Sequence, residues 1–139
     1  MLKIVLDANV FVSAILNPHG SPARVLGLIK GGKIRLLTSF EIVSEVNRVL
    51  LYPKIRKRYK NTYHEVERYL YKVFALAEFT EGKLKVEMVV DDPADNKYLA
   101  CAMEGQADFI VSGDRHLKNL KYFHHIRILN PEEFLKRIG

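Results

Sequence analysis

Short apolar runs that alternate with segments of helical period are the feature that most limits how this chain can fold. The runs are rich in β-branched residues and cover residues 2–6, 33–37, 84–90, 109–112 and 127–129. Strands separated by helices predict a mainly parallel sheet with helices on both of its faces. No repeat, low-complexity stretch or long linker interrupts the pattern, so we expect a single domain that spans residues 1–139.

Start and stop signals predict six helices. They cover residues 9–16, 22–30, 38–51, 62–79, 92–104 and a last segment that begins at Pro131. Thr38 and Thr62 each precede a Glu by three residues, which is the spacing of a capping box. Asp92 stands directly before Pro93, as an N-cap residue followed by a first helical residue would.

The charge balance favours a polyanionic partner without proving one. Lys and Arg number 22 against 16 Asp and Glu, which gives a net charge of +6. Five of the cations fall within residues 54–60, where no acid occurs. Many unrelated proteins are mildly basic, so the total alone does not identify the partner.

Nothing in the sequence indicates a membrane or secreted protein. No apolar run approaches the roughly 18 residues of a membrane span, and the first residues lack the apolar stretch of a secretory signal. Cys101 is the single cysteine and lies among apolar residues, so we expect it in the core. A cytoplasmic location is the expectation that fits these observations.

Four acids fall where an α/β sheet forms its sites, beyond the carboxyl ends of the strands. Asp7 directly follows the first strand, and Asp114 follows the fourth. Asp95 lies in the first turn of the helix after the third strand, and Glu45 lies at the edge of the apolar face of the helix after the second. We therefore expect these four carboxylates to share one pocket.

Such a pocket needs cations. Four carboxylates held close together repel one another unless positive charge compensates them. Mg²⁺ or Mn²⁺ suits oxygen ligands, and the absence of CxxC and HExxH spacings argues against zinc. The usual chemistry of such a site is phosphoryl transfer to water.

Each acid except Asp7 also has a structural interpretation. Asp92 is better explained as an N-cap than as a ligand. Asp95 could serve only to favour the positive end of its helix, and Glu45 could be an ordinary solvated residue. Asp114 could cap the short turn that follows it. The combination of the acids is stronger than any one of them.

The motifs that carry these acids resemble the PIN domain. They are Leu-Asp-Ala-Asn-Val-Phe-Val-Ser-Ala at 6–14, Glu45, Asp-Pro-Ala-Asp-Asn-Lys-Tyr-Leu at 92–99 and Ile-Val-Ser-Gly-Asp at 110–114. The resemblance covers nearly the whole chain and is greatest to bacterial and archaeal PIN proteins related to the VapC toxins. It implies a three-layer α/β/α sandwich around a five-stranded parallel sheet in the order 3-2-1-4-5.

The resemblance also implies a function. Proteins of this kind are expected to be Mg²⁺- or Mn²⁺-dependent endoribonucleases, often homodimeric, that act as the toxin of a toxin–antitoxin pair. An antitoxin protein would then cover the acidic pocket. Asp7, Glu45, Asp95 and Asp114 match the metal-binding acids of the family.

Further residues match supporting positions of the family. Asn9 and Ser112 are expected to orient the carboxylates or bound water, and Asp92 is a further acid beside the pocket. Asn9 could equally be the N-cap of its helix. The residues best placed by sequence to contact RNA are Arg115, His116, Lys118 and Arg24. The basic run at 54–60, with Tyr52 and Tyr59 for stacking, could also contact RNA or could be a solvated loop.

Three alternatives remain open at this point. An acid phosphatase or phosphoacceptor would use Asp7 as a nucleophile, but Asn9 stands where an Asp-x-Asp motif needs its second acid. A PIN module could bind RNA or protein without cleaving it. A PIN nuclease could process RNA without being a toxin.

Overall fold

A mostly parallel sheet forms the centre of the computed structural model, which describes residues 1–84 and 93–139. The strands lie in the order β3-β2-β1-β4-β6-β5, and every neighbouring pair is parallel except β5 with β6. Their bounds are β1 Lys3–Leu6, β2 Arg35–Thr38, β3 Glu78–Phe79, β4 Phe109–Val111, β5 Tyr122–Phe123 and β6 Ile126–Leu129.

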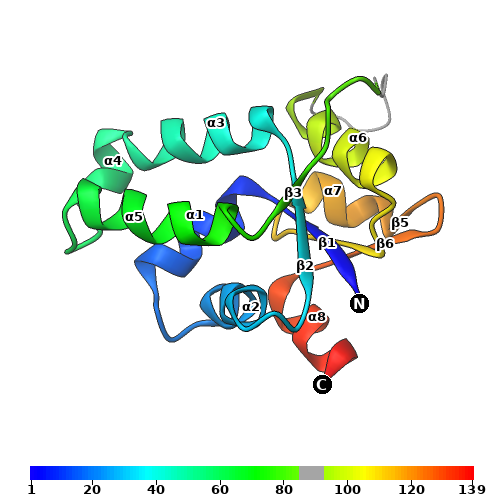
Figure 1. Ribbon diagram of the computed structural model, residues 1–139, viewed down its shortest axis with the longest axis horizontal. Helices are drawn as coiled ribbons and strands as arrows, with labels where there is room; N and C mark the ends of the chain where they lie inside the picture. Colours follow the sequence, from blue (N-terminus) through cyan, green and yellow to red (C-terminus); the bar gives the residue numbers. More distant parts are fainter. Residues whose placement is uncertain (85–92) are drawn as a thin grey trace.

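Helices cover both sides of the sheet. Figure 1 shows α1, α2 and α5 on one side and α6 and α7 on the other. The helices are α1 Ala8–Leu16, α2 Ser21–Lys30, α3 Phe40–Leu50, α4 Pro53–Arg56, α5 Tyr63–Phe74, α6 Asn96–Gly105, α7 Arg115–Leu120 and α8 Pro131–Ile138, and a 3₁₀ turn covers Pro93–Asp95. The predicted three-layer α/β class is confirmed.

Within residues 1–84 and 93–139, the sheet has six strands rather than the expected five. The additional strand is β5, which forms an antiparallel hairpin with β6 at the sheet edge. The two residues between them, His124 and His125, are exposed, as expected for a surface turn. A strand of only two residues gives too little alternation to be recognised in a sequence.

The strand beside β2 is not where the sequence suggested. Residues 85–90 of the predicted third strand lie outside the described residues, and Leu84 is not part of a strand. The strand that pairs with β2 is Glu78–Phe79, in the register Leu37 with Glu78. The helix predicted to reach residue 79 ends instead at Phe74. No Gly or Pro marks that end, so the sequence carried no stop signal.

The capping predictions had mixed outcomes. Thr62 and Glu65 form the predicted capping box of α5. The other predicted box is wrong, because Thr38 is the last residue of β2 and the Ser39 side chain caps α3. Asp92, the predicted N-cap of α6, lies outside the described residues. Pro131 occupies the first turn of α8, as predicted.

The core lies on both faces of β1. Ile4, Val5 and Leu6 are almost completely buried there. Fully burying an apolar side chain of this size contributes about 1.5–3 kcal/mol.

Cys101 is buried as expected, and burial raises the pKa of its thiol to about 11, so it is no nucleophile. None of the helices in the described part of the chain combines the length and apolar character required to cross a bilayer.

Candidate active site

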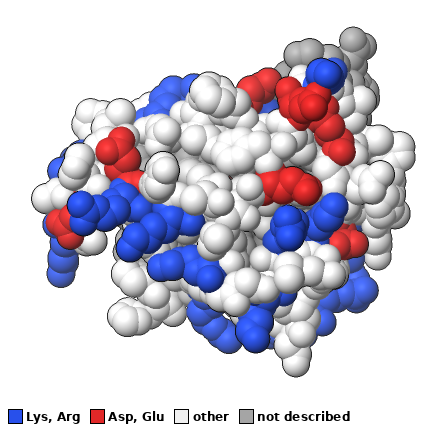
Figure 2. Space-filling view, viewed as in Figure 1, with Lys and Arg blue, Asp and Glu red and all other residues white. Residues whose placement is uncertain are grey.

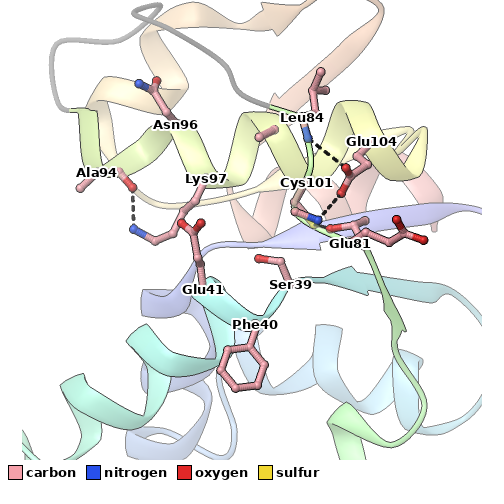
Figure 3. A pocket seen from close by; sticks show the side chains of 13 residues that line it. Ser39, Phe40, Glu41, Glu81, Leu84, Ala94, Asn96, Lys97, Cys101 and Glu104 are labelled. Atoms are coloured by element: carbon pink, nitrogen blue, oxygen red, sulfur yellow. Dashed lines mark hydrogen bonds between the residues drawn. The ribbon is translucent and has the colours of Figure 1, made fainter.

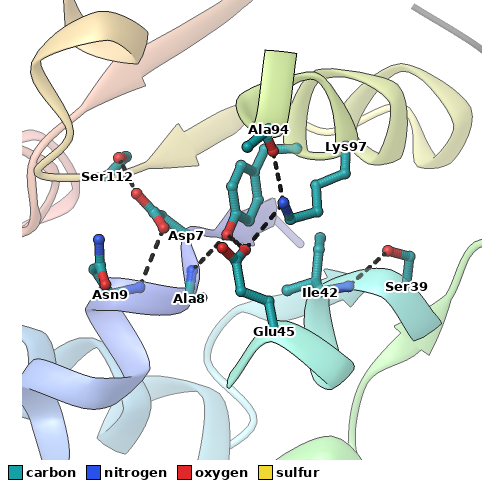
Figure 4. A network of polar contacts seen from close by, with 10 residues as sticks. Asp7, Ala8, Asn9, Ser39, Ile42, Glu45, Ala94, Lys97 and Ser112 are labelled. Atoms are coloured by element: carbon teal, nitrogen blue, oxygen red, sulfur yellow. Dashed lines mark hydrogen bonds and ion pairs between the residues drawn. The ribbon is translucent and has the colours of Figure 1, made fainter. Parts of the chain in front are cut away.

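Asp7 is the first residue after β1 and is only 4% exposed. Its Oδ2 accepts a hydrogen bond from the Ser112 hydroxyl at 2.6 Å, and its Oδ1 accepts from the Asn9 backbone N–H at 3.1 Å (Figure 4). Burial raises the pKa of Asp7, and the nearby charge of Asp114 raises it further. The hydrogen bonds from Ser112 and Asn9 lower the pKa, but these neutral donors do not offset the effect of burial.

Ser112 connects Asp7 to Asp114. Its hydroxyl donates to Asp7 and accepts from the Asp114 backbone N–H at 2.9 Å. Ser112 is fully buried at the end of β4, which pairs directly with β1. The order of these strands therefore brings together two acids that are 107 positions apart in the sequence. Ser112 was predicted to orient the carboxylates, and these two hydrogen bonds are the contacts through which it would do so.

Both of these acids are also helix caps. Asp7 is the N-cap of α1, a structural role that the sequence did not suggest. Asp114 caps α7, because its Oδ1 accepts from the backbone N–H groups of His116 at 2.7 Å and Leu117 at 3.2 Å. The structural interpretation of Asp114 is thus present in the molecule, and it does not exclude metal binding.

Glu45 lies in different surroundings on α3. Its Oε1 accepts a hydrogen bond from the Tyr98 hydroxyl and forms an ion pair with Lys97 Nζ at 3.1 Å (Figure 4). The Lys97 and Glu45 side chains are 14% and 22% exposed. Lys97 Nζ also donates to the Ala94 carbonyl oxygen at 2.6 Å. The positive charge that faces Glu45 thus comes from the protein itself.

Tyr98 joins three helices at this site. Its hydroxyl accepts from the Ala8 backbone N–H at 3.1 Å and donates to Glu45. Burial, together with the charge of Asp7, raises the pKa of Tyr98 far above its usual value. The hydroxyl therefore keeps its proton and its donor role. Lys97 and Tyr98 were not among the predicted site residues, although they lie within the motif at 92–99.

The remaining predicted site residues are Asp95, Asn9 and Asp92. Asp95 ends the 3₁₀ turn and is buried, and its side chain makes no capping bond to α6. Asn9 is exposed in the first turn of α1. The alternative that Asn9 caps this helix is wrong, because Asp7 is the cap. Asp92 lies outside the described residues.

Two of the predicted carboxylates at this site are suitable ligands for a hard divalent cation. Asp7 and Asp114 offer oxygen ligands, and the pKa of Asp7 is raised mainly because burial disfavours its charged form. Within residues 1–84 and 93–139, no three Asp, Glu, His or Cys side chains are grouped closely enough to hold a metal ion. The expected convergence of four acids is therefore not seen there. Mg²⁺ often binds through only one or two carboxylates and keeps several waters.

Two of the predicted RNA contacts lie beside Asp114. Arg115 and His116 are exposed at the start of α7. Lys118 is one turn further along and forms an ion pair with Glu133 of α8 at 3.3 Å. Surface pairs of this kind are weak, so Lys118 remains able to exchange its partner.

Other predicted contacts have less favourable surroundings. Arg24 is exposed on α2, in a hollow of about 240 Å³ that Glu132 of α8 also lines. The alternative in which Tyr59 stacks on RNA is not supported, because this residue is only 6% exposed. Its hydroxyl donates to the Leu50 carbonyl oxygen at 3.0 Å. Tyr52 remains 47% exposed.

A groove of about 360 Å³ adjoins the Glu45 side of the site (Figure 3). Lys97 lines this groove as well as pairing with Glu45, so the two regions meet at that side chain. Three acids also line it, Glu41, Glu81 and Glu104. The Glu104 carboxylate accepts from the backbone N–H groups of residues 82–84 and fixes that edge of the groove.

Comparison with known proteins agrees with the fold and the motifs. The family model described as PIN domain matches residues 3–116. The uncharacterized protein MJ1680 of Methanocaldococcus jannaschii is 32% identical over 143 residues, which cover 97% of this chain and 90% of that protein.

A solved structure shows the same fold. The crystal structure of PAE2754 from Pyrobaculum aerophilum matches with a TM-score of 0.64 and 20% identity, over 98% of this chain and 88% of that one. PIN domains are generally nucleases and typically use divalent metal ions. Because the family model covers most of the sequence, this chain belongs to the PIN domain family.

Proposed function

We propose that this protein is an endoribonuclease that hydrolyses RNA phosphodiester bonds with the aid of Mg²⁺ or Mn²⁺. The observation that carries the proposal is the pair of hydrogen bonds by which the Ser112 hydroxyl connects Asp7 to Asp114. These bonds link a buried carboxylate to the backbone N–H of Asp114, whose own charge is near enough to raise the pKa of Asp7, at the carboxyl ends of two adjacent parallel strands. Such a site gains most from a doubly charged ion.

The residues have distinct roles in this proposal. A divalent ion supplies activation of water and neutralises the leaving oxygen. Asp7 and Asp114 would hold the ion, with Asp95 and Glu45 contributing when the substrate is bound. Ser112 fixes the orientation of the Asp7 carboxylate. Arg115 and His116 would meet the RNA phosphate next to Asp114.

The experiment that tests the proposal compares two Asp to Asn variants on labelled RNA. Asp7→Asn keeps the capping oxygen and should abolish Mn²⁺-dependent cleavage without lowering the melting temperature. Asp108→Asn is the matched control, because Asp108 precedes β4 at the amino end of the strand, opposite to the end that leads to Asp114, and accepts from the Lys3 backbone N–H. Cleavage that persists in excess EDTA would contradict the proposal.

The products distinguish the mechanism. Attack by water with departure of the 3′ oxygen leaves a 5′-phosphate and a 3′-hydroxyl, and it does not need the 2′-hydroxyl. An RNA with a single 2′-deoxy substitution at the cleaved position should therefore still be cut. Products that carry a 2′,3′-cyclic phosphate would contradict this route.

We further propose that the protein is the cytoplasmic toxin of a toxin–antitoxin pair and works as a homodimer. This rests on the resemblance of its motifs to the VapC-like PIN proteins. Expression should arrest growth, Asp7→Asn should not, and the product of a neighbouring antitoxin gene should relieve the arrest. RNA cleavage in vitro without growth arrest would favour an RNA-processing nuclease.

One observation favours a non-catalytic module instead. Asp7 and Asp114 cap helices, and Glu45 has Lys97 as its counter-ion. Each acid thus has a structural role without any metal. Normal RNA binding by the protein, together with no cleavage at any Mn²⁺ concentration, would support this second function.

A further inference from the structure

A basic segment follows α3 and surrounds the short helix α4. It consists of residues 52–60 and carries five cations, Lys54, Arg56, Lys57, Arg58 and Lys60, and no acid. The whole chain has a net charge of +6, so this segment carries nearly as much positive charge as the net of the entire molecule. Among the described residues, none of the five forms an ion pair with a carboxylate, and all but the half-buried Arg56 are exposed.

The basic segment is held in a defined conformation. The buried Tyr59 donates its hydroxyl hydrogen to the Leu50 carbonyl oxygen at the end of α3. The Arg56 guanidinium lies over the Tyr59 ring, 4.8 Å from its centroid. Pro53 opens α4, and the backbone N–H of Ile55 donates to the Tyr52 carbonyl oxygen at 2.9 Å. A partner would therefore meet cations on an ordered backbone, which lowers the entropic cost of binding.

The segment is also connected to the candidate active site by α3. Glu45 lies in the middle of this helix, and the helix ends at Leu50, roughly 8 Å further along its axis. The basic segment begins two residues later with the exposed ring of Tyr52. Figure 2 shows Lys and Arg over the end of the molecule formed by α4 and α5, together with some acids, and over other parts of this face, whereas further acids gather beside α6.

Cations next to an exposed aromatic ring are typical of surfaces that bind single strands, because the cations contact phosphates and the ring stacks on a base. We propose that residues 52–60 bind the backbone of the single-stranded part of an RNA whose cleaved bond lies at Asp7. This assignment deepens the proposed nuclease function and rests on it.

The test measures binding of a fluorescein-labelled oligouridylate in EDTA, where no metal-dependent cleavage occurs. The triple variant Lys54→Ala, Lys57→Ala and Arg58→Ala should raise the Kd at low salt by at least about tenfold. Loss of three phosphate contacts should also lower the slope of log Kd against log salt by about 2. Tyr52→Ala should weaken binding by a further amount that does not depend on salt.

The matched control removes three exposed cations elsewhere, with Lys33→Ala, Lys136→Ala and Arg137→Ala. It produces the same net charge, and we expect it to leave the Kd within about twofold of wild type. Equal weakening by both triple variants would show a general charge effect and overturn the proposal. The proposal would also be overturned if the Lys54, Lys57 and Arg58 triple variant bound RNA normally and lost binding only to anionic vesicles or to an acidic protein.

Two comparisons separate this inference from the proposed function. Equal weakening on duplex RNA of the same sequence length would overturn the assignment to a single strand. If Asp7→Asn does not affect cleavage, the nuclease proposal fails, and the EDTA binding result still decides whether residues 52–60 bind RNA. Melting temperatures equal to wild type confirm that the variants are folded.

Discussion

The candidate site has two halves, one formed by Asp7, Ser112 and Asp114 and the other by Glu45, Lys97 and Tyr98. The negative charge of the carboxylates has different partners in the two halves. In the Asp7 half, the partners are a hydroxyl, a backbone N–H and a second carboxylate nearby. In the Glu45 half, the partner is the ammonium group of Lys97, assisted by the Tyr98 hydroxyl. Among the residues that the structure describes, no cation is seen to pair with Asp7, whereas Glu45 has Lys97.

This difference shows where an added cation would matter most. A buried carboxylate with neutral partners resists ionisation, and a positive ion beside it removes that penalty. A carboxylate that already faces a lysine gains much less. We therefore expect the first cation to bind at Asp7 and Asp114, and Glu45 to respond to it only weakly.

The largest predicted effect separates the halves by their affinity for Mn²⁺. Asp7→Asn should weaken Mn²⁺ binding by more than about a hundredfold, since loss even of a residue that orients a ligand costs 10–100-fold. Glu45→Gln, which keeps the hydrogen bond with Tyr98, should weaken it by less than about tenfold. Isothermal titration calorimetry measures both constants. Equal losses in the two variants would show that the halves do not differ.

The next effect concerns the hydroxyl that joins Asp7 to Asp114. Ser112→Ala removes the donor to Asp7 and the acceptor for the Asp114 N–H. We expect the turnover number for RNA cleavage to fall by roughly 10–100-fold. The pH profile of cleavage measures the same change, because loss of this hydrogen bond should raise the pKa of Asp7 further. An unchanged profile would mean that Ser112 has only a packing role.

A third prediction concerns removal of the cation from the Glu45 half, which would leave its carboxylate with a neutral donor, as in the Asp7 half. Lys97→Met leaves Glu45 without its cation, which should lower the free energy of unfolding by about 2 kcal/mol. Urea unfolding in EDTA measures the loss, and Lys97→Met with Glu45→Gln should recover part of it. Added Mn²⁺ should stabilise Lys97→Met more than it stabilises the wild type. No difference in this response would contradict the comparison.

Much of the fold was predictable from the sequence because its signals are local. The strand that ends at Leu6 and the helix that begins after Thr62 were identified from a β-branched run and a capping box. β3 could not be recognised in this way. Glu78 and Phe79 form a strand only because they pair with β2, and the paired residues are 41 positions apart in the chain.

The site shows the same limit. Asp7 and Asp114 were found because each follows a strand, which is a feature of local sequence. Lys97 and Tyr98 were missed because their importance comes from Glu45, which approaches them only after α3 and α6 pack together. The helix-capping role of Asp7 was missed because Ala8, rather than Asn9, begins α1.

The smallest predicted effect is a pH dependence that belongs to the Asp7 half alone. Burial raises the pKa of Asp7 above its value in the unfolded chain, which is about 3.9. The folded protein therefore holds this proton more tightly. The stability that the proton contributes is complete below the unfolded pKa and is lost as the pH rises through the folded pKa.

The Asp7→Asn variant has no ionisable side chain at this position. Its stability should therefore not fall as the pH rises through the folded pKa of Asp7. In EDTA, we expect the variant to become steadily more stable relative to the wild type as the pH rises above about 4 and through the raised pKa of Asp7. Chemical unfolding of both proteins over this pH range gives the difference directly, and groups common to both cancel. Mn²⁺ at neutral pH should reverse the order, because it stabilises only the protein that binds it. A stability difference that stays constant with pH would show that Asp7 is ionised in the fold at no cost, and the reason for placing the cation there would be lost.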